Sequence, residues 1–421
     1  MNTGSSQPAE DDTIAAVERV LVALEHPADG VPDVVVDERR LVEAAEALAA
    51  GTGPLAIDAE RASGYRYGQR AYLVQVRREG AGTWLIDPIA CPDLSPIAEA
   101  VADVEWVLHA ATQDLACLAE VGLRPSRLFD TELGARLVGL PRVGLAAVVE
   151  HYLGLSLAKE HSAVDWSTRP LPEPWLLYAA LDVEVLVEVR DHIEAELEAQ
   201  DKVEWAWQEF DALTRFTGPA PKVDPWRRTS GMHRVRNRRT AAMVRELWAE
   251  RDVLAAQRDV SPGRVLPDAA LIELAVTAPR TASELPEGHP GRLARRNQRT
   301  WLEAIQRARS LPDEDLPALT LRAEGPPPAR AWADRDPVAA ARLADARAAM
   351  AAFAHEHSAP VENVLSPDHL RRVLWTPPRP ATVGSIGAAL AALGARRWQV
   401  DIAAPIVVAA IEAHPEADQN A

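Results

Sequence analysis

Residues 55–88 read LAIDAERASGYRYGQRAYLVQVRREGAGTWLIDP and contain three short apolar runs separated by glycine-containing turns. These runs predict three β-strands. Upstream, Asp-Val-Val-Val at 33–36 predicts a short strand, and Asp37 stands where the N-cap of a helix ending at Gly51 would lie. Downstream, helical and strand-like stretches alternate as SPIAEAVAD, WVLHA, TQDLACLAEVG and LFDT. This order predicts an α/β domain, whereas residues 144–214 read as entirely helical.

Length and composition limit what the rest of the chain can be. The chain has 421 residues, 48% of them hydrophobic and 25% charged, which is typical of a soluble globular protein with two to four domains. No apolar run approaches 18 residues, so we expect no membrane segment. The first residues, MNTGSSQPAEDD, read as a polar disordered lead-in rather than a signal peptide. Two cysteines exclude a disulfide framework, and we expect a cytoplasmic location.

Charge is strongly segregated along the chain. The net charge is −17, but residues 1–214 carry −22, residues 215–310 carry +9 and residues 311–421 carry −4. A basic middle segment therefore follows an acidic first half, and the overall charge does not exclude nucleic acid as a partner.

Two helical segments follow a Gly- and Pro-containing stretch at 217–232, and the Pro-rich stretch Pro312–Pro328 separates them. RVLPDAALIEL at 264–274 resembles NVLSPDHLRRVL at 363–374, because both place Val-Leu before a Pro-Asp helix start. The similarity predicts a diverged internal repeat.

Five residues could carry chemistry, although each also has a local structural explanation. Asp58 and Glu60 share one face of a strand, which could simply be solvated. Tyr178 and Asp182 lie one helical turn apart and could form an ordinary surface hydrogen bond. Asp114 lies in a first helical turn, where the helix dipole favours an acid. Considered together, these oxygen donors suit Mg²⁺ or Mn²⁺ rather than zinc, and two such ions could clamp a phosphodiester.

The same residues carry a family resemblance. LAIDAE, HAATQDLACL and YAALD resemble the three motifs of the DEDD 3′–5′ exonucleases in their tyrosine-bearing subclass, and LAKEHSAVDWSTRPL resembles a segment of the ribonuclease D family. The two C-terminal segments resemble HRDC domains, the second less closely. The resemblance implies an RNase H-like α/β domain with a mixed sheet flanked by helices, followed by two all-α HRDC-like domains. The implied boundaries are a lead-in at 1–28, the exonuclease domain at 29–214, a basic linker at 215–235, HRDC domain 1 at 236–312, a Pro-rich linker at 313–332 and HRDC-like domain 2 at 333–415.

The resemblance also implies roles for individual residues. Asp58, Glu60, Asp114 and Asp182 would ligate two divalent cations, Mg²⁺ or Mn²⁺, and Tyr178 would orient the attacking water. His109 and Gln113 could contact the 3′-terminal nucleotide or could serve only in packing. Trp166 could stack on a base or pack in the protein core.

An arginine-rich segment, RRTSGMHRVRNRR at 227–239, contains six arginines and no acid. We expect it to bind phosphate, with Arg234 and Arg238 forming a ridge on one helix, unless it is only a solvated surface. The six are Arg227, Arg228, Arg234, Arg236, Arg238 and Arg239.

With the resemblance, these residues predict a cytoplasmic, monomeric 3′–5′ exoribonuclease that trims structured RNA and releases nucleoside 5′-monophosphates. The resemblance implies tRNA precursors as substrates. No nucleotide-binding P-loop motif occurs, so we expect no ATP-driven activity. A DNA exonuclease and a non-catalytic nucleic-acid-binding protein are the alternatives, and the carboxylates do not distinguish RNA from DNA.

Overall fold

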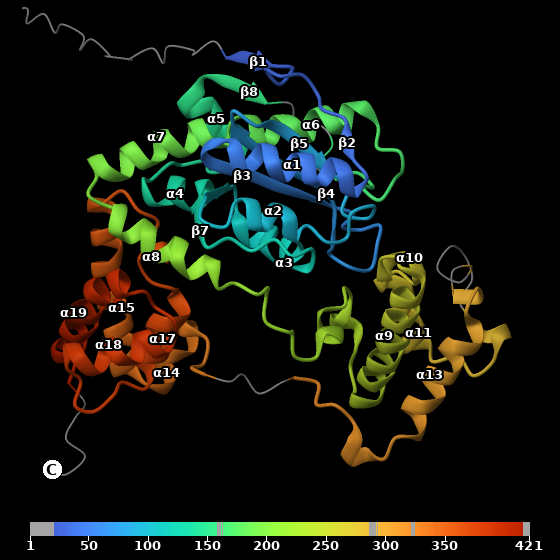
Figure 1. Ribbon diagram of the computed structural model, residues 1–421. Helices are drawn as coiled ribbons and strands as arrows, with labels where there is room; N and C mark the ends of the chain where they lie inside the picture. Colours follow the sequence, from blue (N-terminus) through green and yellow to red (C-terminus); the bar gives the residue numbers. More distant parts are fainter. Residues whose placement is uncertain are drawn as a thin grey trace, which may run out of the picture.

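The structure, a computed structural model, describes residues 21–157, 161, 163–285, 292, 294–320 and 325–415. Its centre is a six-stranded sheet in the order β2-β5-β4-β3-β6-β7 (Figure 1). The pairs β3–β4 and β4–β5 are antiparallel and the other neighbours are parallel, so the predicted mixed sheet is confirmed. The strands are β2 (Val34–Val35), β3 (Thr52–Arg61), β4 (Ala71–Glu79), β5 (Gly82–Ile86), β6 (Glu105–Leu108) and β7 (Arg127–Asp130).

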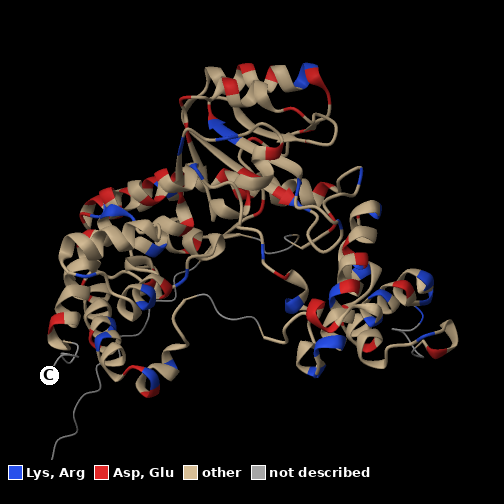
Figure 2. Ribbon diagram, turned by 90° about the horizontal axis from the view of Figure 1, so that it is seen from below, with Lys and Arg blue, Asp and Glu red and all other residues tan. Residues whose placement is uncertain are grey.

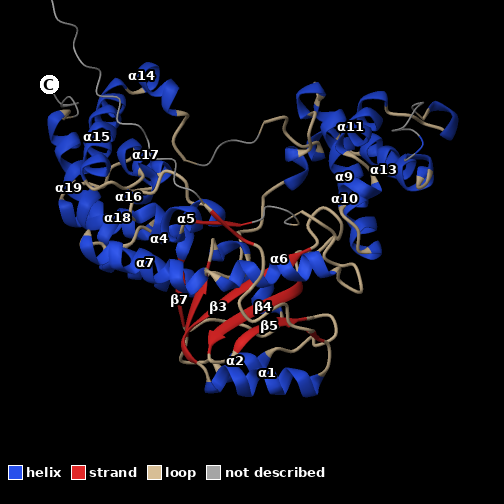
Figure 3. Ribbon diagram, turned by 90° about the horizontal axis from the view of Figure 1, so that it is seen from above, coloured by secondary structure: helices blue, strands red, loops and turns tan. Residues whose placement is uncertain are grey.

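Helices cover both faces of this sheet. Helices α1 (Glu38–Ala50) and α2 (Ser95–Ala100) lie on one face, and α6 (Glu173–Glu184) and α7 (Leu186–Ala199) lie on the other (Figure 3). As predicted, Asp37 caps α1, accepting a hydrogen bond from the Arg40 amide, and the helix ends at Gly51. Leu55 and Ile57 are fully buried in the core that includes α1, so the alternate residues of β3 face α6. The remaining helices of this domain are α3 (Leu115–Glu120), α4 (Thr131–Leu137), α5 (Leu145–Leu153) and α8 (Val203–Thr214).

A second, two-stranded sheet corrects two predictions. Strand β1 (Val22–Leu24) pairs in parallel with β8 (Leu155–Leu157). The prediction of a disordered lead-in over 1–28 is therefore wrong for residues 22–24, and residues 1–20 lie outside the described residues. The all-helical prediction for 144–214 is likewise wrong at β8. Each strand is only three residues long and pairs with a distant segment, so neither leaves a periodic local signal.

Two helical modules follow the α/β domain. The first comprises η2 (Pro225–Arg228), η3 (Met232–Arg234), α9 (Arg238–Arg258), α10 (Pro262–Val265), α11 (Asp268–Thr277), η4 (Ala282–Glu284), α13 (Gln298–Ser310) and η5 (Asp313–Asp315). The second comprises η6 (Ala329–Ala331), α14 (Trp332–Arg335), α15 (Pro337–Glu356), α16 (Val361–Val364), α17 (Pro367–Trp375), α18 (Val383–Ala392) and α19 (Arg397–Ala413). The order of long helix, single turn and shorter helix recurs in α9–α11 and α15–α17, as the predicted repeat requires. Among the described helices, none combines the length and apolarity needed to cross a bilayer.

The first module begins earlier than expected. Trp226 and Val235 were predicted within a linker at 215–235, but both are buried in the core of the first module. Burial of an indole ring anchors this segment to α9, so the linker prediction is wrong for this part. The other domain boundaries stay predictions.

The two modules contact the α/β domain at different sides of it (Figure 1). The second module packs on α8, where the Trp205 and Trp398 rings stack at 4.7 Å. The first module contacts the loop between β3 and β4 through polar groups. Ser261 N donates to Tyr65 O at 3.0 Å, and the Tyr67 hydroxyl donates to Asp252 at 2.9 Å.

Candidate active site

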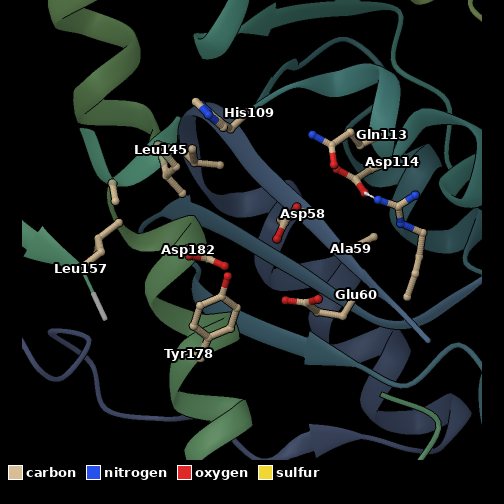
Figure 4. A pocket seen from close by; sticks show the side chains of 13 residues that line it. Asp58, Ala59, Glu60, His109, Gln113, Asp114, Leu145, Leu157, Tyr178 and Asp182 are labelled. Carbon is tan, nitrogen blue, oxygen red and sulfur yellow. Dashed lines mark ion pairs between the residues drawn. The ribbon is translucent and has the colours of Figure 1, made fainter. Parts of the chain in front are cut away.

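Four of the five catalytic candidates come from two elements that face each other across one pocket (Figure 4). Asp58 and Glu60 project from β3, and Tyr178 and Asp182 project from α6. Asp114 comes from the junction between η1 (Ala111–Gln113) and α3. The pocket has a volume of about 460 Å³, and its other lining residues are Ala59, Arg61, His109, Gln113, Leu145, Ala146, Leu157 and Leu186.

Three of the carboxylates converge closely. One oxygen each from Asp58, Glu60 and Asp182 lie within 4.8 Å of one another. Asp114 lies at the edge of this cluster, where it shares a side-chain hydrogen bond with Asp58 and pairs with Arg61 at an Nη2–Oδ1 distance of 3.7 Å, marked by the dashed line in Figure 4. The structure therefore brings all four predicted acids into one pocket and places an arginine beside one of them.

Burial and mutual repulsion favour the protonated form of these acids. Glu60 is 8% exposed and Asp114 is 5% exposed. Burial, together with the charges of Asp58, Asp182 and Asp114, raises the pKa of Glu60 to about 10. Burial first and the charge of Asp58 second raise the pKa of Asp114 and of Asp182 well above the usual range. A metal-free pocket at neutral pH is thus an electrostatically unfavourable place for carboxylates.

This donor set fits hard divalent cations. Carboxylate oxygens are the ligands that Mg²⁺ and Mn²⁺ prefer, and a bound cation would relieve the repulsion just described. As far as the chain is described, the pocket lining contains no cysteine and a single histidine, which argues against a zinc site.

Tyr178 lies beside Asp182 in the same pocket (Figure 4). Burial and the neighbouring carboxylates raise the pKa of its hydroxyl far above the usual value, so the phenol stays protonated and can donate or accept a hydrogen bond. Behind the ring lies Trp166, with ring centroids 6.5 Å apart. Trp166 is fully buried, so the predicted stacking on a substrate base is wrong, because none of its ring is accessible to a ligand.

His109 and Gln113 both line the pocket, as the motif suggested. His109 Nδ1 lies 2.9 Å from the Thr131 hydroxyl, which itself donates to Leu108 O. The hydroxyl therefore accepts from Nδ1–H, which leaves His109 Nε2 as a hydrogen-bond acceptor. Burial lowers the pKa of His109 to about 4, so the ring is neutral at pH 7. Whether either residue contacts a nucleotide stays a prediction.

The arginine-rich segment does not form the predicted ridge. Arg234 ends η3, whereas Arg238 begins α9, and extended residues separate them, so the two do not share a helix. Arg238 and Arg239 donate to carbonyls at the end of α13 and beyond, including Leu316 O and Leu311 O. These contacts stabilise the module itself and leave fewer N–H donors of Arg238 and Arg239 free to bind phosphate.

The other four arginines of this segment differ in how far their guanidinium groups are free to bind phosphate. Arg227 lies over the Trp226 ring and bonds Asp224, and Arg234 pairs with Glu273 at 2.6 Å. Arg228 and Arg236 are exposed, and no side-chain hydrogen bond or ion pair to either occurs within the described parts of the chain. Figure 2 shows basic residues at several places along the ribbon of the first module, interspersed with acidic ones. Phosphate binding by this segment stays a prediction, now centred on Arg228 and Arg236.

Two residues that sequence reasoning missed organise the pocket. Asp130, at the end of β7, accepts hydrogen bonds from the Ala110 and Ala111 amides at 3.0 and 2.8 Å and so holds the turn that precedes Asp114. Ala110 has a left-handed backbone (φ 59°), which costs energy for a non-glycine residue and needs such support. Arg61 follows Glu60 directly. In a sequence, an arginine next to an acidic strand residue is expected to face solvent. The one signal for Arg61 is that it directly follows the LAIDAE motif.

Three family models match the chain. A model described as 3′-5′ exonuclease covers residues 32–198, a model described as HRDC domain covers 240–305, and a model described as 3′ to 5′ exonuclease C-terminal domain covers 325–411. The first match spans the strands and helices that build the pocket.

Relatives and solved structures agree with these matches. The ribonuclease D of Jannaschia sp. (strain CCS1) is 34% identical over 292 residues, which cover 65% of this chain and 74% of the relative. This chain belongs to the ribonuclease D family. As a family member with a matching exonuclease domain, it is a 3′–5′ exonuclease. This ribonuclease D family chain also resembles a crystal structure of a protein from Bifidobacterium adolescentis, with 41% identity, a TM-score of 0.84, and coverage of 93% of this chain and 100% of that one.

A crystal structure of Escherichia coli RNase D shares the fold, with 23% identity, a TM-score of 0.65, and coverage of 91% of this chain and 99% of that one. The expected fold class, an RNase H-like exonuclease domain followed by HRDC-type helical domains, is thereby confirmed.

Proposed function

We propose that this protein is an exoribonuclease that removes 3′-terminal nucleotides from structured RNA, with tRNA precursors as substrates, and releases nucleoside 5′-monophosphates. The observation that carries the proposal is the convergence of Asp58, Glu60 and Asp182 within 4.8 Å, with Asp114 and Tyr178 in the same pocket. Membership of the ribonuclease D family supports RNA rather than DNA as the substrate. The first module, with its excess of arginine, offers a surface for a structured RNA body.

In the proposed mechanism, Asp58, Glu60, Asp114 and Asp182 hold two Mg²⁺ or Mn²⁺ ions. When bound, these ions supply Lewis acidity, which lowers the pKa of the attacking water and stabilises the leaving oxygen. Tyr178 keeps its proton and orients the water through its hydroxyl. His109 Nε2, as an acceptor, suits a ribose hydroxyl of the terminal nucleotide better than a phosphate oxygen. Gln113 is exposed at the pocket and can contact the same nucleotide.

We further propose that the protein acts in the cytoplasm as a monomer and without ATP. The domain division given above, with the corrections at residues 22–24 and at the start of the first module, belongs to the same proposal: an exonuclease domain that performs hydrolysis, followed by two helical domains that position the RNA.

The test uses two oligonucleotides of one sequence, one RNA and one DNA, each forming a hairpin with a single-stranded 3′ tail. The purified protein is incubated with each in EDTA, Mg²⁺ or Mn²⁺, and products are resolved by length and by mass. The proposal predicts stepwise shortening of the RNA from its 3′ end only with a divalent cation, with nucleoside 5′-monophosphates as products. Faster shortening of the DNA would favour a DNA exonuclease, and binding without shortening in any cation would favour a non-catalytic binding protein.

A further inference from the structure

Among the described residues that line the catalytic pocket, Arg61 is the only lysine or arginine. It is the last residue of β3, and the pairing with β4 shifts register between Glu60 and Arg61. Side chains of adjacent strand residues ordinarily point to opposite faces, yet both of these residues line the pocket. One guanidinium therefore shares the pocket with four carboxylates.

The contact of Arg61 with Asp114 is loose. The Nη2–Oδ1 distance of 3.7 Å is longer than the ~2.7–2.9 Å of a charge-assisted hydrogen bond. A guanidinium has five N–H donors, and Asp114 is its sole ion-pair or side-chain hydrogen-bond partner within the described ranges. The side chain is 25% exposed, so its free donors can reach a ligand in the pocket.

Arg169 shows what a structural arginine looks like in the same domain. It donates to both carboxylate oxygens of Asp87 at 2.6 and 2.8 Å and also to the carbonyls of Tyr72 and Trp166. Its guanidinium is saturated by the protein. Arg61 has no comparable set of partners, and its position inside the pocket is not explained by holding the fold together.

We propose that Arg61 binds the substrate: in the metal-free protein it lies beside Asp114 at 3.7 Å, and in the complex it contacts a phosphate oxygen of the bound RNA while Asp114 holds a cation. This inference rests on the proposed function, because it takes the pocket to bind cations and a 3′-terminal phosphodiester. Arginine suits this contact, since its planar fork matches two phosphate oxygens. In this role Arg61 touches substrate and is a catalytic-site residue that the metal-binding motif does not include.

The first test measures RNA binding in Ca²⁺, which replaces Mg²⁺ to suppress hydrolysis. Wild type and Arg61→Gln are titrated with a four-nucleotide RNA and with two analogues that carry a neutral methylphosphonate at the last or the penultimate linkage. We expect Arg61→Gln to weaken binding of the unmodified RNA by about tenfold to a hundredfold, the loss typical of one charged hydrogen bond. The analogue that is neutral at the contacted linkage cannot pair with Arg61, so wild type and the variant should bind that analogue with equal affinity. The position of its methylphosphonate then identifies the contacted phosphate.

Two further variants serve as controls. Arg61→Lys keeps the charge but not the fork, so it should recover part of the affinity. Arg136→Gln removes the same charge from an arginine that pairs with Glu132 on α4, outside the pocket, and should bind as wild type does. If Arg61→Gln binds all three RNAs as tightly as wild type, the phosphate contact is refuted.

The second test asks whether Arg61 serves the fold instead of the substrate. In EDTA, Arg61→Gln should melt close to wild type, because its one contact, at 3.7 Å to Asp114, is loose. Arg169→Gln, which loses both bonds to Asp87, should melt clearly below wild type. A drop for Arg61→Gln as large as that for Arg169→Gln would show a structural role and overturn the inference.

These results separate the inference from the function on which it rests. Wild-type protein that shortens RNA with a divalent cation, together with unimpaired RNA binding by Arg61→Gln, refutes only the role of Arg61. Wild-type protein that shortens no RNA in any cation refutes the proposed function itself.

Discussion

Replacing Glu60 with glutamine should stabilise the metal-free protein. The pKa of Glu60 rises from 4.5 to about 10 because the side chain is buried beside Asp58, Asp182 and Asp114. A carboxyl group with a raised pKa must take up a proton on folding, so its contribution to stability is fully present below pH 4.5 and is lost as pH rises toward 10. The pH of 7.5 lies three units above the pKa of 4.5 that Glu60 has in the unfolded chain. At about 1.36 kcal/mol per unit, Glu60 therefore lowers the free energy of unfolding by roughly 4 kcal/mol at this pH.

The assay is unfolding in EDTA at pH 7.5 and at pH 4.5. At pH 7.5, Glu60→Gln should unfold with a midpoint higher by roughly 10 °C, given ~2–4 °C per kcal/mol for a domain of this size. At pH 4.5 the two midpoints should approach each other. Saturating Mn²⁺ should raise the wild-type midpoint more than that of the variant. Glu188→Gln, at an exposed position of α7, is the control and should change little. A variant no more stable than wild type in EDTA at pH 7.5 would refute the repulsion argument.

Three other predictions follow. Tyr178→Phe should lower turnover by ~10²–10⁴-fold and leave RNA affinity in Ca²⁺ unchanged. Single-turnover kinetics and a binding titration measure the two quantities, and an unchanged turnover would show that the hydroxyl serves only in packing. Replacing Arg228 and Arg236 with Gln should lower the slope of log affinity against log salt for a structured RNA by roughly 0.7–0.9 per lost phosphate contact, whereas an unchanged slope would exclude them from the RNA interface. Arg239→Gln should instead lower the melting midpoint of the first module, because it removes bonds to carbonyls in the last turn of α13 and just after it; calorimetry would detect the loss, and an unaltered midpoint would contradict it.

The catalytic pocket could be predicted from sequence because its parts lie in strong local patterns. Asp58 and Glu60 alternate with buried Leu55 and Ile57, so the strand period alone places both acids on one face. The helical spacing of Tyr178 and Asp182 does the same for α6. These local patterns do not show that the acidic face of β3 lies opposite the acidic face of α6. That expectation came from the family resemblance.

Other features have no local signal. The pairing of β1 with β8 depends on contacts between distant segments, and three residues are too few for a periodic pattern. The segment at 227–239 looks uniformly basic, but Val235 turns inward and interrupts it. Trp166 is equally ambiguous, since an indole ring suits a base-binding surface and a buried core alike, and only the packed structure distinguishes them.

The central claim is that the carboxylate pocket performs the hydrolysis, and the activity of Asp182→Asn tests it most directly. The variant keeps the shape of the side chain on α6 but removes one charge from the three converging carboxylates. The rate of 3′-end removal from a tailed RNA in Mn²⁺ is compared with wild type and with Asp191→Asn, a surface control whose side chain is 62% exposed. We predict that Asp182→Asn loses hydrolysis while remaining folded, and that Asp191→Asn retains it. Hydrolysis by Asp182→Asn within a factor of about two of wild type would contradict the account.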